Sequence, residues 1–272
     1  MRPAVWTKGE QTVAKTLKRI YAGALQIAAL YDRCSPRDTP KQRQAKRQAS
    51  SEAQRRMNQI YSYQKLELML AVNFPTPGSG QVVTLTYDED HLPADRAGVQ
   101  KDWRNCLRRL RQERTAAQQP APVAFWSIEV LTGLHNRWHL HAVIDSTGRD
   151  LEQLQRAWPY GRIEMETLRV DAEKNHESLA RYMTKESREC QDYGSKPGLR
   201  SWSCTRNAKK PETDTVTVPD DYELDPPDGC TVLLDENRST VYASWRVLKI
   251  RVGAAGFAAP PRPKRRRPRR KR

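Results

Sequence analysis

Between residues 81 and 185 the sequence contains short segments of two kinds, and their order restricts the folds that this chain can adopt. β-branched and apolar runs predict strands at 81–87, 123–130, 138–144 and 162–170. Apolar residues at helical spacing predict helices at 99–114, 150–158 and from 175 to about 189. The order strand, helix, strand, strand, helix, strand, helix lacks the regular alternation of a parallel sheet. We therefore predict an α+β fold, in which helices flank a central antiparallel or mixed sheet.

Four regions follow from the breaks in these patterns. We expect a basic helical region at 1–74, the core domain at 75–210, an extension at 211–252 and a disordered basic tail at 253–272. Two helices are predicted in the first region, an amphipathic one from about Glu10 to Arg33 and a second from Lys41 to Asn73. The basic first half of the second helix is read equally well as a solvated face or as a phosphate-contacting arm.

The residues after the core domain are harder to assign. Residues 191–230 are polar and contain several prolines, so we expect them to be mostly irregular. Strands are predicted at 231–234 and 240–252, on either side of a turn at 235–238.

The charge of the chain indicates a polyanionic partner. It carries a formal +16, and the run Arg262–Arg272 contributes nine of the positive charges, which leaves +7 without it. An excess that persists outside the tail favours nucleic acid first and an anionic membrane second, with a merely solubilising surface as the alternative. Because no apolar stretch approaches the ~20 residues of a membrane span and the N-terminus lacks a signal-peptide core, we expect a cytosolic protein.

A candidate metal site lies in the strand at 138–144. His139 and His141 are two residues apart, so on a strand both imidazoles lie on one face. Glu129 ends the preceding strand, and a short connection would bring its carboxylate alongside. Two imidazoles and a carboxylate would leave coordination positions for phosphate oxygens and water. The alternatives are two ordinary strand histidines, and a strand-end acid paired with Arg137.

A candidate nucleophile follows on the last helix. Tyr182 and Lys185 are three residues apart, so their side chains lie on one helix face and can meet at one phosphate. Since tyrosine phenols have an ordinary pKa near ~10, such a nucleophile needs a metal-polarised electrophile and nearby positive charge. The alternative is a half-buried tyrosine beside a solvated lysine. Four tryptophans are candidates for stacking unpaired bases, although core packing is the favoured role of each: Trp126, Trp138, Trp158 and Trp202.

Taken in order, these motifs resemble those of a known superfamily. The series comprises Val82–Pro93, Glu129, His139-Leu140-His141, Leu154 with Trp158 and Gly161, Ala180–Lys185, and the basic segments Arg200–Ser203 and Asn207–Pro211. Over about residues 50–210 it resembles the HUH endonucleases, in particular the rolling-circle replication initiators of small single-stranded DNA phages and related plasmids or integrated elements.

The resemblance implies a sheet of about five antiparallel strands, with a metal site on one face and the tyrosine helix beside it. His139 and His141 match the histidine ligands, and Glu129 lies where a third polar ligand is often found. Tyr182 matches the nucleophile, and Lys185 matches the lysine that follows it. The implied metal is Mg²⁺ or Mn²⁺, although imidazole ligands alone also suit Zn²⁺, Fe or Ni.

The implied reaction nicks single-stranded DNA, or an origin hairpin, and leaves a 5′-phosphotyrosine and a free 3′-OH. This chain has one tyrosine in its nucleophile motif, whereas some relatives have two, so the resemblance does not say how a second strand transfer is made. The strand Thr84–Tyr87 matches the family's first motif, for which we favour a packing role.

Partners and setting also follow from the resemblance. The chain contains no GxxxxGK[ST] sequence, so we expect unwinding by a separate host helicase, with the host replication machinery, in a bacterial cytoplasm. For the basic tail we favour DNA retention over a nuclear-localisation role. Two alternatives remain: a mobilisation relaxase or single-strand transposase with the same chemistry, and a non-catalytic DNA- or RNA-binding module. The sequence leaves the oligomeric state open.

Overall fold

The structure is a computed structural model of the whole chain. It describes residues 14–32, 52–131, 137–171, 175–185, 200–239 and 244–253, without the side chains of 52–57, 185, 238 and 239. The chain divides into two compact units, Met1–Cys34 with Glu212–Arg272, and Ser35–Pro211, and each is described by itself. Nearly all of the predicted disordered tail, from 254 onward, lies outside the described residues.

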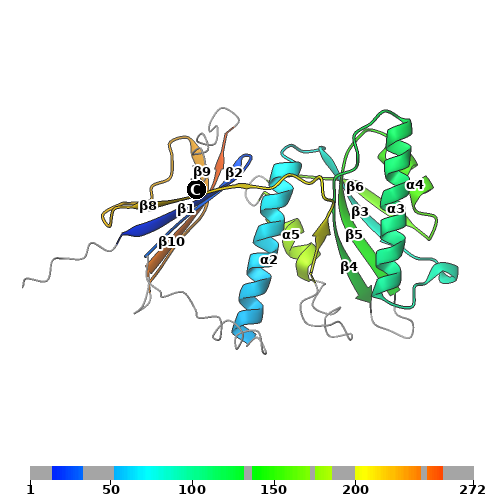
Figure 1. The fold of residues 1–272 in the computed structure, drawn as a ribbon, viewed down its shortest axis with the longest axis horizontal. Helices are drawn as coiled ribbons and strands as arrows, with labels where there is room; N and C mark the ends of the chain where they lie inside the picture. The colour runs from blue at the N-terminus through cyan, green and yellow to red at the C-terminus, as the bar shows by residue number, and fades with distance from the viewer. Residues whose placement is uncertain are drawn as a thin grey trace, which may run out of the picture. The chain divides into compact units, whose positions relative to one another are not determined.

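The unit formed by Ser35–Pro211 is built on a five-stranded antiparallel sheet (Figure 1). Its strand order is β6-β3-β5-β4-β7. The strands are β3 (Gly80–Thr86), β4 (Ala124–Leu131), β5 (Arg137–Asp145), β6 (Ile163–Thr167) and β7 (Ser203–Cys204). All four neighbouring pairs run antiparallel. The predicted α+β fold with a central antiparallel sheet is therefore confirmed.

Helices cover both faces of this sheet. On one face, α3 (Arg96–Ala116) and α4 (Asp150–Ala157) contribute Trp103 and Leu154 to a core with the strand residues Leu85 and Leu140. On the other face, α2 (Glu52–Asn73) and α5 (Glu177–Lys185) pack over Phe125 and Val143. A short 3₁₀ helix, η1 (Glu89–His91), follows β3. No helix in the described part of the chain is long and apolar enough to cross a membrane.

The second unit contains another five-stranded antiparallel sheet, in the order β8-β1-β2-β10-β9. Its strands are β1 (Lys15–Ala22), β2 (Leu25–Asp32), β8 (Glu212–Val218), β9 (Cys230–Ser239) and β10 (Ser244–Val252). Leu17, Leu30, Leu248 and Ile250 form its buried centre. Because β1 and β2 pair with strands about two hundred residues away, this unit closes only when both ends of the chain come together.

The predicted helix from Glu10 to Arg33 is wrong, because residues 15–32 form the hairpin β1–β2. Gly23 has φ +63°, a conformation that glycine adopts without steric cost, and the tight turn pairs Ala22 with Leu25. The apolar spacing suits a helix as well as a hairpin, and pairing with distant strands decides between them. The predicted helical region 1–74 is thus helical at 52–73, which confirms most of the second helix, whereas residues 33–51 lie outside the described chain.

Two further predictions near the C-terminus need correction. The segment 191–230, expected to be mostly irregular, contains strand β8, whose alternating threonines and valines pair with β1. The turn expected at 235–238 lies inside strand β9, where Asp235 pairs with Leu248. Polar residues are tolerated there because β9 is an edge strand with one side open to solvent.

Candidate metal and nucleophile site

The register of β4 against β5 brings the three predicted metal ligands together. Glu129 lies directly opposite His139, and His141 is two residues further along the same face of β5. One donor atom from each of the three side chains lies within 4.8 Å of the other two. Glu129 and His141 are buried and His139 is half-buried. Predicted from separate strands, these side chains thus form one cluster.

Hydrogen bonds fix the orientation of His141. Its Nε2 atom lies 2.9 Å from Glu129 Oε2, and its Nδ1 atom lies 3.1 Å from Thr84 Oγ1. Thr84 is opposite His141 in the register of β3 against β5. If Nδ1 donates its hydrogen to the threonine hydroxyl, the Nε2 lone pair faces the carboxylate and can bind a cation.

The donor set fits a small divalent cation. Two ligands at right angles around an ion such as Mg²⁺, each about 2.1 Å from it, lie about 3 Å apart. The separation of 2.9 Å between His141 Nε2 and Glu129 Oε2 is close to that value. The cluster is therefore compatible with a divalent metal, and its chemistry alone does not choose among the metals that accept nitrogen and oxygen ligands.

Burial also affects the protonation of His139. Removing its imidazole from water disfavours the charged form and is the largest cause of a pKa below the ordinary value, while the nearby Glu129 carboxylate opposes the shift. A lowered pKa keeps the ring neutral near neutral pH, which is the form that binds a metal.

Helix α5 brings Tyr182 to the same cluster. Ala180 and Met183 are buried in the core under α5, and Tyr182 between them is 46 % exposed. The centre of its ring lies 5.2 Å from that of His141, with the two planes at 74°. The phenol therefore lies beside the metal cluster and is also open to solvent. Lys185 is the last residue of α5, and its side chain lies outside the described residues, so its role stays a prediction.

Sequence reasoning missed Thr84, for which it favoured a role in packing. A threonine that alternates with apolar residues on a strand is common, and only the pairing of β3 with β5 reveals that Thr84 faces His141. The packing role favoured for the tryptophans fits Trp138 and Trp158, which are buried in the core of the α3 and α4 face. Trp126 and Trp202 are half-buried and line a cavity at the edge of β4.

Comparison with known protein families adds one finding. Residues 80–187 match a family model that describes the replication-associated protein ORF2. The matched segment runs from β3 to the end of α5, so it contains Glu129, both histidines and Tyr182, although it covers less than half of the chain. Searches of curated proteins and of solved structures gave no significant match. The similarity is consistent with a role in the initiation of replication.

Proposed function

We propose that this protein is a replication initiator that nicks single-stranded DNA at an origin and rejoins the strands. The observation that carries the proposal is the position of Tyr182, whose ring centre is 5.2 Å from that of His141 within the cluster of possible metal ligands. A tyrosine that is both exposed and next to two imidazoles and a carboxylate suits attack on a bound phosphate better than a structural role does. Similarity to a replication-associated family supports the same function.

The proposed reaction exchanges one phosphodiester for another. The Tyr182 oxygen attacks phosphorus and forms a new O–P bond, while the bond from phosphorus to the 3′ oxygen breaks. The phenol loses its proton and the departing 3′ oxygen gains one, so the products are a 5′-phosphotyrosine and a free 3′-OH. The reverse reaction, with a 3′-OH as nucleophile, rejoins the strand without any external energy source.

The residues of the cluster would hold the scissile phosphate in place for this attack. Glu129, His139 and His141 would hold a divalent ion, Mg²⁺ or Mn²⁺ by resemblance, which when bound polarises the phosphate and offsets its negative charge. Thr84 keeps the His141 ring in the orientation that presents Nε2. Tyr182 is anchored by the buried residues on either side of it, so its oxygen has a restricted range of approach.

The substrate would be unpaired DNA in a bacterial cytoplasm, with unwinding by a separate helicase. The nucleophile cannot easily reach a phosphate inside a regular duplex, whereas a single strand can lie across the exposed side of Tyr182. The overall formal charge of +16 supports binding to a polyanion.

The test is the formation of a covalent protein–DNA adduct. The full-length protein is incubated with a pool of random-sequence single-stranded oligonucleotides and Mn²⁺ or Mg²⁺, and adducts are detected on a denaturing gel. We expect a slower-migrating species that contains DNA, that requires the metal and that is lost in the presence of EDTA.

Variants complete this test. Tyr182→Phe should abolish the adduct, whereas the matched control Tyr61→Phe, at a tyrosine that is 59 % exposed on α2, should leave it intact. Absence of any adduct with either metal, or an undiminished adduct in Tyr182→Phe, would overturn the proposed function and would favour a non-catalytic nucleic-acid-binding module.

A further inference from the structure

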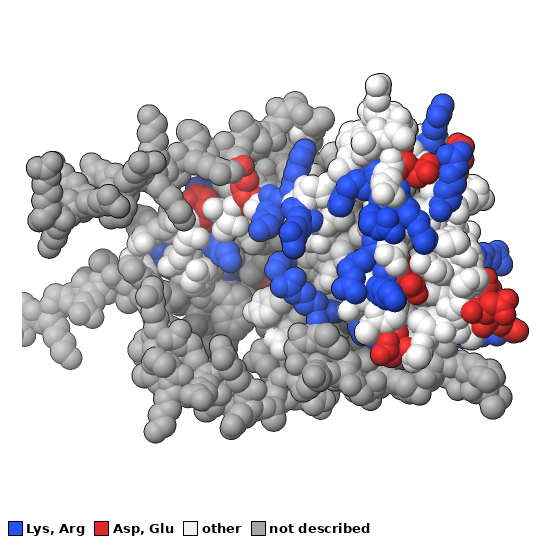
Figure 2. All heavy atoms as spheres, turned by 45° about the vertical axis from the view of Figure 1, so that its right-hand side comes forward, with Lys and Arg blue, Asp and Glu red and all other residues white. Residues whose placement is uncertain are grey.

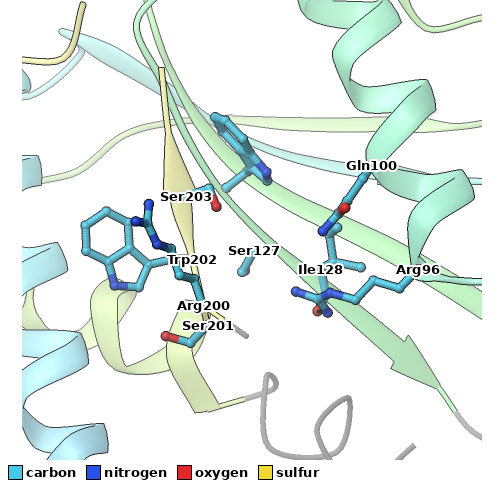
Figure 3. A pocket seen from close by; sticks show the side chains of 9 residues that line it. Arg96, Gln100, Ser127, Ile128, Arg200, Ser201, Trp202 and Ser203 are labelled. Carbon is cyan, nitrogen blue, oxygen red and sulfur yellow. Dashed lines mark hydrogen bonds between the residues drawn. The ribbon is translucent and has the colours of Figure 1, made fainter. Parts of the chain in front are cut away.

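A cavity of about 230 Å³ opens at the outer edge of β4. Strand β7 pairs only with Phe125 and Trp126, so from Ser127 onward the described neighbours leave the edge of β4 uncovered. Figure 3 shows Arg96 and Gln100 reaching from α3 on one side, and the segment 200–203 on the other, with Ser127 and Ile128 of β4 between them. The size suits one small ligand unit, since sites for larger organic ligands start near ~300 Å³.

Two buried polar atoms in the lining lack a hydrogen-bond partner among the described residues. Ser127 is 2 % exposed, and its Oγ atom makes no hydrogen bond. Arg96 reaches the Ile128 carbonyl with Nη1 at 3.4 Å, but its buried Nε has no partner. Buried donors are nearly always satisfied in folded proteins, so two such atoms around one cavity indicate a ligand that accepts hydrogen bonds.

The charge of the lining favours an anionic ligand. No Asp or Glu lines the cavity, and its two charged residues are Arg96 and Arg200. No ion pair joins either guanidinium to an acidic side chain in the described part of the chain. Uncompensated arginines favour a phosphate.

The lining also offers aromatic surface. Trp126 packs against Trp103 with ring centres 5.6 Å apart, and Trp202 donates its Nε1 hydrogen to the Ser62 carbonyl at 3.2 Å, so both indoles are held in place. Indole faces stack on any nucleobase, and arginines beside them bind the adjoining phosphate. An amide from Gln100 and the hydroxyl of Ser127 lie in the same lining, where they can hydrogen-bond to a base edge.

The cavity adjoins the metal cluster. Ser127 lies directly opposite His141 in the β4–β5 register, and it is two residues from Glu129 on the same face of β4. Directly opposed residues in antiparallel strands have Cβ atoms about 5 Å apart. A DNA strand with one phosphate at the cluster would therefore bring a neighbouring nucleotide to the cavity.

We propose that this cavity binds one unpaired nucleotide of the DNA strand next to the scissile phosphate, with the base against the indoles and the phosphate held by Arg96 and Arg200. The place of this nucleotide in the reaction rests on the proposed function, whereas its binding does not. Contacts from Ser127 and Gln100 would give the protein a base preference at a single position.

The experiment separates binding from chemistry by using the full-length Tyr182→Phe protein in EDTA. The probe is a labelled oligothymidylate followed by fluorescence anisotropy, with an abasic strand of the same length as competitor. We expect the pair Arg96→Gln and Arg200→Gln to weaken binding about tenfold or more, and Arg200→Gln, at an exposed residue, to weaken it alone. The control pair Arg104→Gln and Arg108→Gln, exposed on α3, removes the same charge and should cause a distinctly smaller loss.

A second readout tests the base. The unsubstituted cavity should prefer oligothymidylate to the abasic strand about fivefold or more, and Ser127→Ala or Trp202→Leu should reduce this preference. Equal losses in the two arginine pairs, or no preference for the strand with bases, would overturn the proposal, the latter leaving only an anion site that inorganic phosphate should also occupy. If the arginine and base effects appear but no covalent adduct forms, the proposed function fails and the cavity proposal stands. An adduct with none of these effects would support the proposed function and overturn the cavity proposal.

Discussion

The hydroxyl of Thr84 and the carboxylate of Glu129 hold the two nitrogens of His141, at 3.1 Å and 2.9 Å. The ligands themselves could be predicted from the sequence, because strand alternation alone places His139 and His141 on one face. Thr84 could not be, since its role depends on which strand pairs with β5 and in which register. The same holds for Ser127, whose neighbour is known only once β4 and β5 are aligned.

Replacing Thr84 by Val tests this supporting contact. The substitution keeps the shape but removes the partner of Nδ1, so the imidazole loses a fixed orientation and the metal affinity should fall about 10- to 100-fold. Isothermal titration with Mn²⁺ measures it. Thr167→Val, at an exposed threonine at the end of β6, is the control, and equal affinity in both variants would contradict the assigned role of Thr84.

His176 makes a second prediction at this scale, for stability. The ring is 1 % exposed, its Nε2 atom lies 3.0 Å from the Phe74 carbonyl, and its Nδ1 atom has no partner. Burial is the largest cause of a pKa below the ordinary value, because a proton on Nδ1 would be placed in the core without an acceptor.

A depressed histidine pKa means that the unfolded chain binds the proton first as the pH falls. Below about pH 6.5 the free energy of unfolding should therefore decrease, by up to about 1.4 kcal/mol per pH unit from this group, until the folded pKa is reached. Urea unfolding between neutral and mildly acidic pH measures the slope. His176→Asn should have a shallower slope than the natural chain, and identical slopes would show that His176 does not titrate differently on folding.

At the scale of elements, the strands and helices of the unit built from 35–211 were predictable because each has a strong local period. The hairpin β1–β2 was not, since its apolar residues satisfy helical spacing and its partner strands β8 and β10 are distant in sequence. Strand β8 was missed for a related reason: its alternating threonines and valines are bounded by prolines and acidic residues that resemble a loop.

Arg114 joins α3 to the end of β5. Its guanidinium is 1 % exposed, and it donates to Asp145 Oδ1 at 2.7 Å and to the Asp145 carbonyl at 2.6 Å. Arg114→Met leaves the carboxylate without this partner and should reduce the free energy of unfolding by about 3–5 kcal/mol. Urea denaturation measures the change. Arg111→Met, exposed on the same helix, should cost much less, and similar losses in the two variants would argue against a role for this ion pair.

At the scale of the whole molecule, positive charge is the dominant property. Figure 2 turns the side that carries α3 in Figure 1 toward the viewer, and Lys and Arg side chains gather in the middle of that view. Exposed cations on α3 follow a helical period, at Lys101, Arg104, Arg108 and Arg111, so they form one row along its outer face. Net charge could be read from the sequence, but this row required the orientation of α3.

The run Arg262–Arg272 should add affinity without selectivity. Deleting it removes nine positive charges, and the dependence of log Kd on log salt should become shallower by about 0.7 for each phosphate that the tail no longer neutralises. Single-strand binding measured at several salt concentrations gives this slope. The deletion variant should still form the covalent adduct, because the tail contributes no residue to the cluster. An unchanged slope would show that the tail does not contact DNA.

The central claim is that Tyr182 is the nucleophile that joins protein to DNA. Digestion of the adduct with protease and nuclease, followed by tandem mass spectrometry of the remaining nucleotide-bearing peptide, locates the linkage directly. We predict a 5′-linked phosphotyrosine at Tyr182, beside the cluster of Glu129, His139 and His141. A linkage at any other residue, or through the 3′ end of the DNA, would contradict the account.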